Sequence, residues 1–231
     1  MIAGDCCIAH PVLALTPTLL SILVGLAEPA EAEGAPSAVA SKRTASVEQR
    51  PTLLVPALHS AGVIIGMRAS LWVLWPDHFD PLRGGESARN FRLAWTSIPE
   101  YDRRHLLFES DGDPWAVNVV GHGLFGSEIY LRMRGCGHAP MASFAAAAIA
   151  STAWEYGVEA FHQRPSAIDL VWTPIAGALL GEGRHQLYGM LDRVGPNGGL
   201  LRRVGMILLD PFGEAEGAVF SVCRSPAHAH P

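Results

Sequence analysis

The segment that most constrains the fold is residues 150–184, where acidic side chains interrupt an otherwise apolar pattern. A helix is predicted over residues 140–162, because a run of alanines precedes the acids and alanine is the strongest helix former. In such a helix Glu155, Glu159 and His162 have the spacing i, i+4, i+7 and share one face. The segment therefore predicts a helix that places two carboxylates and a histidine side by side.

A connector follows this helix and carries further polar side chains. The proline after Arg164 ends the helix, because a residue that precedes proline avoids the α region. Ser166 and Asp169 have the spacing of a capping box, in which the serine caps the next helix. Thr173, followed by a proline, indicates a second start and a helix over residues 174–191. These signals predict a helical hairpin whose connector carries Arg164, Ser166 and Asp169.

A helix that begins near Trp115 carries polar side chains on two adjoining ridges. These side chains are Asn118, His122, Ser127, Tyr130 and Arg134. Polar groups on an otherwise apolar helix need partners if they are buried. Glu155, Glu159 and Asp169 are the acids available as partners. We therefore expect the two polar faces to meet, and Arg134 to pair with Glu155 or Glu159.

Glycines four residues apart mark places where another backbone can approach a helix closely. One such pair is Gly177 and Gly181, in the helix predicted after the connector. The other pair is Gly62 and Gly66, in an apolar helix predicted over residues 53–75. Two close helix contacts are therefore expected.

The apolar run over residues 53–75 contains two polar side chains, His59 and Arg68. A charged arginine at the centre of a membrane costs about 2.5–3.5 kcal/mol. Two alternatives stay open for this helix. Either it packs in a helical bundle with Arg68 paired, or it lies at a membrane interface with the arginine reaching the polar layer.

Shorter elements complete the predicted fold. A short amphipathic helix is expected over residues 86–95, residues 200–210 form a helix or a strand, and residues 218–223 are compatible with a strand. Together with the longer segments, they predict an all-α bundle of about four or five helices that encloses a polar cluster.

The start of the chain predicts export. Residues 12–26 are apolar, and Ala30-Glu31-Ala32 fits a cleavage site for a signal peptide. Asp5 stands where a positive charge is usual, so a retained membrane anchor is the alternative to cleavage. The predicted organisation is a signal peptide over 1–32, a flexible linker over 33–50, a helical domain over 51–223 and a disordered tail over 224–231.

Charge content limits the partners of this chain. Charged residues make up 17% of the sequence, whereas about 25% is typical of soluble domains. Lys42 is the only lysine and the arginines are scattered, so no surface for nucleic acid is expected. The composition favours membrane or envelope components as partners, and it identifies no protein partner.

The polar pattern resembles a known family. The residues that carry the resemblance are Asn118, His122, Gly126, Ser127, Tyr130, Arg134, Trp154, Glu155, Glu159, Arg164, Pro165, Ser166, Asp169, Thr173, Pro174, Gly177, Gly181 and Glu182. Over residues 118–213 the chain is similar to a bacterial family catalogued as domain of unknown function 3943. The resemblance implies an envelope protein of a Gram-negative bacterium, periplasmic or membrane-associated, and brings no biochemical activity. A fainter similarity links the same pattern to the VanZ-like membrane proteins.

No metal or other cofactor is expected, although two metal sites stay open as alternatives. A di-iron bundle uses Glu-x-x-His pairs and further carboxylates from other helices. The residues available for it are Glu159 and His162, Glu182 and His185, and Glu128. The second alternative is a single zinc ion bound by His122 with Glu155 or Glu159.

The polar cluster leads to two hypotheses about function. The first is a satisfied polar network that fixes the register of the helices. It implies an exported, membrane-associated envelope protein with a structural or interaction role. The second is a membrane-associated hydrolase, metal-dependent or acid/base, that acts on lipid or cell-wall material. His122 and an acid would then activate Ser127, which lacks the flanking glycines of a nucleophile elbow.

The cysteines predict one disulfide bond. Removal of the signal peptide leaves Cys136 and Cys223. Export places these thiols in an oxidising compartment, where they can pair. The expected bond would hold the C-terminal segment against the bundle.

Overall fold

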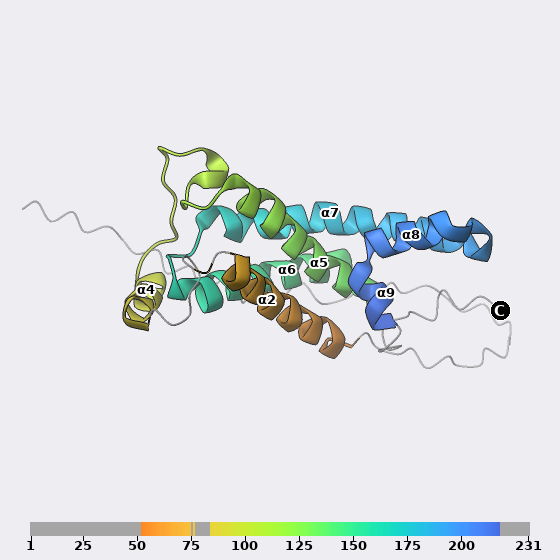
Figure 1. Ribbon diagram of the computed structural model, residues 1–231, viewed down its shortest axis with the longest axis horizontal. Helices are drawn as coiled ribbons and strands as arrows, with labels where there is room; N and C mark the ends of the chain where they lie inside the picture. Colours follow the sequence, from red (N-terminus) through yellow and green to blue (C-terminus); the bar gives the residue numbers. More distant parts are fainter. Residues whose placement is uncertain (1–51, 75, 77–83, 218–231) are drawn as a thin grey trace, which may run out of the picture. The chain divides into compact units, whose positions relative to one another are not determined.

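The computed structural model describes residues 52–74, 76 and 84–217 (Figure 1). Every described residue belongs to one unit of the chain, Gln49–Pro231. The predicted signal peptide, the predicted linker, the possible strand over residues 218–223 and the tail therefore lie outside the described residues.

The described residues form an all-α fold, as predicted. The α-helices are α2 (Leu54–Leu74), α4 (Gly84–Thr96), α5 (His122–Gly135), α6 (Pro140–Ala153), α7 (Ala167–Arg193), α8 (Gly199–Leu209) and α9 (Pro211–Gly217). Short turns of 3-10 or π type lie at Leu107–Glu109, Val117–Gly121, Trp154–Val158, Glu159–Phe161 and Gly195–Gly198. This part of the chain has more helices than the four or five expected. Of the segment 200–210, residues 200–209 are helical rather than extended, and α9 begins directly after Asp210.

Helices α5, α6 and α7 pack against one another, and α5 crosses α7 closely (Figure 1). A Cβ atom on Gly126 would lie 2.1 Å from the carbonyl oxygen of Thr173. A Cβ atom on Gly177 would lie 2.6 Å from the backbone of Gly126, and one on Gly181 would lie 2.7 Å from the ring of Tyr130. Only glycine fits at these distances, so the close approach predicted for Gly177 and Gly181 is confirmed.

Helix α7 begins earlier than predicted and runs through Pro174 without a break. The expectation of a new helix at Thr173 is therefore wrong. Ser166 already caps this helix, because its side chain accepts a hydrogen bond from the N–H of Asp169. The hydroxyl of Thr173 lies 3.0 Å from a ring nitrogen of His122 instead of capping. The side chain that looked like a second start signal thus belongs to a contact between α5 and α7.

Helix α2 packs one face on an apolar core and leaves most of its length exposed. The core side chains are Phe125, Ile129, Ala150 and Trp154, and α2 places Val63, Ile64, Met67 and Leu71 against them. Nothing lies within 4 Å of a Cβ built on Gly62 or Gly66, so the close contact predicted there is wrong. Arg68 contacts the ring of His162, as the paired alternative requires.

Cys136 follows α5 and is disulfide-bonded. The predicted partner, Cys223, lies outside the described residues. The pairing of these two cysteines therefore stays a prediction.

Candidate functional site

Two π-helical turns bring the polar side chains to the same level of the bundle. The turn Val117–Gly121 contains Asn118 and leads directly into His122, the first residue of α5. The turn Trp154–Val158 follows α6 and contains Glu155. Turns of this type are rare, and they occur frequently at functional sites because the extra residue re-aims the side chains.

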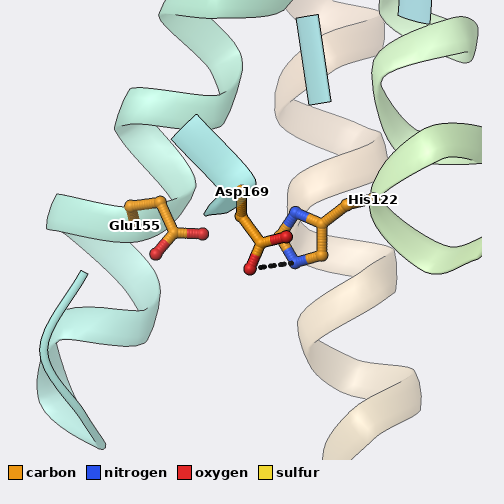
Figure 2. A group of neighbouring side chains, drawn as sticks. All are labelled: His122, Glu155 and Asp169. Atoms are coloured by element: carbon orange, nitrogen blue, oxygen red, sulfur yellow. Dashed lines mark ion pairs between the residues drawn. The ribbon is translucent and has the colours of Figure 1, made fainter. Parts of the chain in front are cut away.

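His122, Glu155 and Asp169 point toward one another between α5, the end of α6 and the start of α7 (Figure 2). One potential ligand atom from each residue lies within 4.8 Å of the others. His122 Nε2 is 3.8 Å from Asp169 Oδ2. The three residues are buried, with relative exposures of 2%, 0% and 1%. The predicted meeting of the two polar faces is confirmed at this point.

Asp111 adds a further carboxylate from the loop before α5. Its oxygens accept hydrogen bonds from Asn118 Nδ2 at 2.8 and 3.0 Å and from the Ser166 hydroxyl at 2.5 Å. Its Oδ1 also accepts from the N–H of Asp113 at 3.0 Å. Asp111 therefore joins the loop, the π-helical turn before α5 and the cap of α7.

Glu159 occupies the other side of the site and is held by neutral donors. Trp154 Nε1 donates to Glu159 Oε2 at 2.8 Å, and Gln163 Nε2 donates to Oε1 at 3.2 Å. Gln163 Nε2 also donates to Asp113 at 2.9 Å. We use the term acid cluster for the buried carboxylates gathered here, namely Asp111, Asp113, Glu155, Glu159 and Asp169.

Burial changes the charge state of the acid cluster. It raises the pKa of Asp169 to about 9, with a further contribution from the neighbouring Asp111. It raises the pKa of Glu159 to about 8 and raises that of Glu155, where the Glu159 carboxylate also contributes. Burial lowers the pKa of His122 to about 4, so the imidazole is neutral at pH 7. At neutral pH much of the cluster is therefore held as neutral acids rather than as carboxylates.

The site is closed, and some of its polar atoms have no partner. Three such atoms are Asn118 Oδ1, Glu155 Oε1 and Asp169 Oδ1. A cavity of about 930 Å³ lies elsewhere, lined by residues of α2, α5 and α9 and by Arg184 and Leu208, and it includes no member of the acid cluster. A substrate would have no open route to His122, because this side chain is almost completely buried.

Arg134 does not reach the acid cluster, so its predicted pairing with Glu155 or Glu159 is wrong. Its Nε donates to Glu182 Oε2 at 2.8 Å, and Tyr130 donates to the same oxygen at 3.0 Å. The hydrogen bond from Arg134 lowers the pKa of Glu182 to about 2. The sequence could not distinguish these acids, because the choice depends on how α5 and α7 align, and Glu182 follows Gly181 directly on α7, well beyond Asp169.

A second arginine, Arg184, holds Ser127. Its Nη1 donates to the Ser127 hydroxyl at 2.6 Å, and its Nη2 donates to Glu128 Oε2 at 2.8 Å. The opposite oxygen of Glu128 is 3.4 Å from His59 Nε2. The hydrogen bond from Arg184 to the Ser127 hydroxyl does not support Ser127 as a nucleophile activated by His122. We use the term arginine cluster for Arg134, Glu182, Arg184 and Glu128.

The remaining predicted residues lie outside the acid cluster or have other roles in it. Arg164 Nη2 pairs with Glu100 at 2.9 Å, at the surface. Ser166 is a helix cap whose N–H also donates to Glu155 Oε2 at 2.7 Å. Across the described residues, His122, Glu155 and Asp169 are the one group of three or more with the geometry of a metal site. The ligand set proposed for a di-iron centre is not brought together.

Sequence reasoning missed two members of the acid cluster, Asp111 and Asp113. They stand in a turn, where aspartate is common for local reasons. One signal was available, because Asp111 precedes the polar ridge of Asn118 and His122 by only two to three helical turns. Thr173 was also missed, because a hydroxyl before proline is typical of a helix cap.

The comparison with protein families bears on this same region. Residues 107–212 match the family model of a domain of unknown function, DUF3943. The chain therefore contains a DUF3943 domain. The resemblance predicted from the polar pattern is confirmed. The match begins at Leu107 rather than at Asn118, so the DUF3943 domain includes Asp111 and Asp113 as well as the later members of the acid cluster.

No curated protein and no solved structure matches the chain. The function of this DUF3943 domain is therefore argued from its own residues.

Proposed function

We propose that this DUF3943 protein is an exported, membrane-associated envelope protein of a Gram-negative bacterium, with a structural or interaction role. In this proposal the apolar outer surface of the helices contacts lipid, and the acid cluster fixes how the helices pack. The observation that carries the proposal is the distribution of polarity, which is the reverse of that in a soluble bundle.

The interior is unusually polar. Among the described residues, sixteen polar or charged side chains are buried, beside thirteen apolar ones and three prolines. Polar side chains of soluble proteins mostly face water, so a buried set that is half polar is informative. Close packing through glycines rather than through large apolar side chains is typical of helices in lipid.

The surface is correspondingly apolar. On α7 and α8, Leu179, Leu201 and Leu208 are 71%, 84% and 75% exposed. Helix α2 is long and apolar enough to cross a membrane by length and composition, with 6% of its most apolar window buried. Exposed apolar surface of this extent indicates a site for a membrane or another protein. The apolar segment over residues 12–26 and the Ala30-Glu31-Ala32 motif support export of the chain to such a membrane.

The burial of the acid cluster favours a structural role over catalysis. A hydrolase needs its acid and base within reach of substrate. Glu155 and Ser166 are fully buried, and the Ser127 hydroxyl is bonded to Arg184. The alternative of a membrane-associated hydrolase, metal-dependent or acid/base, rests on the meeting of His122 with two carboxylates, and it would require the bundle to open.

Vesicle flotation tests membrane contact directly. We expect the mature chain to float with liposomes, and expect Leu179→Gln/Leu201→Gln to bind at least about tenfold more weakly, because each leucine contributes about 1.5–3 kcal/mol when fully buried in lipid. The matched control is Ala142→Gln/Ala153→Gln, which adds the same amides at exposed positions of α6 without removing a large apolar side chain. The proposal fails if the folded wild-type chain stays at the bottom of the gradient, or if the control loses binding as strongly.

Cell fractionation tests the location. A mature N-terminus near Glu33 in the envelope fraction is the expected result. A cytosolic protein with an intact Met1 would contradict export.

A further inference from the structure

We propose that His122, Glu155 and Asp169 bind one divalent transition-metal ion inside the bundle. This inference does not depend on membrane association, because it concerns the interior of the helical domain. It goes beyond a network that only fixes helix register.

The distances fit a small metal ion after minor adjustment. Zinc takes ligand bonds of about 2.0–2.2 Å, which places neighbouring ligands of a tetrahedral ion about 3.3–3.6 Å apart. The three potential ligand atoms already lie within 4.8 Å of one another, and His122 Nε2 is 3.8 Å from Asp169 Oδ2. Rotation of the Glu155 and Asp169 carboxylates would complete the approach without movement of the helices.

The surrounding hydrogen bonds orient these side chains. Thr173 lies 3.0 Å from His122 Nδ1, which leaves Nε2 directed at the carboxylates. The N–H of Ser166 donates to Glu155 Oε2 at 2.7 Å, so Oε1 is the oxygen of this carboxylate that would bind the ion. Partners of this kind hold ligands in position at metal sites. The imidazole and the Glu155 carboxylate are therefore oriented before any ion arrives.

Unpartnered oxygens are the second, independent observation. Glu155 Oε1 and Asp169 Oδ1 are buried without a hydrogen-bond partner, and the two residues are 0% and 1% exposed. Within the described part of the chain, neither carboxylate contacts an arginine or lysine. An unpartnered oxygen at such depth is destabilising, and a metal ion would remove that cost.

The donor set selects the class of metal. A neutral imidazole beside carboxylates suits zinc, iron(II), manganese(II) and related ions, whereas calcium and magnesium prefer oxygen alone. The site is closed on all sides, so the bound ion would stabilise the junction of α5, α6 and α7 rather than meet substrate.

Metal content and thermal stability test the proposal. The full mature chain is purified in detergent, stripped with EDTA and titrated with Zn²⁺. Every protein carries His228→Asn and His230→Asn, so that these two histidines near the C-terminus, which are potential ligands, do not contribute to the zinc count. We expect about one zinc ion per chain after gel filtration, and a rise in Tm of about 5–10 °C at a hundredfold excess over Kd. Much less than one ion per chain, or zinc that leaves Tm unchanged, would overturn the proposal.

An isosteric variant tests the site, because it should abolish the stabilisation by zinc without destabilising the metal-free protein. In Asp169→Asn we expect the rise in Tm on adding zinc to disappear and the zinc content to fall at least tenfold. The metal-free variant should be as stable as metal-free wild type or more stable, because the amide removes a buried acid. The control is Asp192→Asn, on the same helix as Asp169 but in a partly exposed ion pair with Arg202 of α8, and it should keep both zinc and its stabilisation. Retention of stoichiometric zinc by Asp169→Asn would refute the site.

A spectroscopic readout keeps the test decisive if that variant does not fold. Wild type loaded with Co²⁺ should show the intense visible absorption of a low-coordinate ion bound in a closed site. Only the weak spectrum of hydrated cobalt would overturn the proposal.

Discussion

The acid cluster and the arginine cluster each include a carboxylate on α7, yet they compensate its charge in opposite ways. Asp169 near the start of α7 has no arginine beside it, and burial raises its pKa to about 9. Glu182 farther along the same helix is bonded to Arg134, which lowers its pKa to about 2. The first cluster is stable only if it holds protons or a metal ion, whereas the second consists of ordinary ion pairs.

The contact that separates the two clusters should be the most sensitive point. Gly126→Ala places a methyl group 2.1 Å from the carbonyl oxygen of Thr173, and backbone cannot move aside as a side chain can. We expect a loss of more than about 3 kcal/mol in the free energy of unfolding, or failure to fold. The control is Gly183→Ala on α7, where nothing lies within 4 Å of the added Cβ atom. It should stabilise the protein by about 0.5–1 kcal/mol. Equal effects of the two changes in chemical denaturation would contradict the close contact.

Removal of an arginine should affect stability according to how deeply its partner is buried. Arg184→Met leaves Glu128 charged at 8% side-chain exposure, and we expect a loss of about 2–3 kcal/mol. Arg134→Met leaves Glu182 at 27% exposure, where water can replace the arginine, so we expect a loss of about 1 kcal/mol. Urea unfolding of both variants measures the difference. An Arg134 variant that loses more than the Arg184 variant would reverse the assignment.

Neutralising an acid should be nearly silent in the acid cluster and costly in the arginine cluster. Glu159→Gln replaces a carboxyl that is already protonated at pH 7, so we expect a change within about 1 kcal/mol. Glu128→Gln removes the partner of Arg184 and His59, and should cost about 2 kcal/mol. Similar losses from both variants at pH 7 would show that the two clusters do not differ in charge state.

The sequence predicted those parts of the fold that depend on local signals. The all-α class, the cap at Ser166 and the glycines of α7 follow from propensity, capping chemistry and spacing, and the described structure confirms them. Pro174 misled the prediction because its local preference for a helix start was overridden: the helix had already begun at Ser166 and Thr173 had a partner on α5.

The parts that depend on contacts between distant segments could not be predicted. The sequence correctly placed His122 near the acids of the hairpin, because an apolar helix with buried polar groups needs partners. It could not choose Glu182 over Glu155 for Arg134, since that choice depends on how far α5 and α7 slide along each other. Asp111 reaches the cluster from a loop, where periodicity gives no information.

The charge state of the acid cluster is the central claim, and the pH dependence of stability in the metal-free protein tests it most directly. In the unfolded chain Asp169 and Glu159 titrate near pH 4, whereas in the folded chain their pKa values are about 9 and about 8. The folded state therefore binds more protons across this range, and stability falls as pH rises. His122 has the opposite effect only between its folded pKa of about 4 and its unfolded pKa of about 6.5, so it does not contribute above pH 6.5. Between pH 6.5 and pH 9 these pKa values correspond to a loss of about 5 kcal/mol in EDTA-treated wild type, and we expect the Glu159→Gln/Asp169→Asn variant to lose much less. Equal stability of the wild type at pH 6.5 and pH 9 would contradict the account.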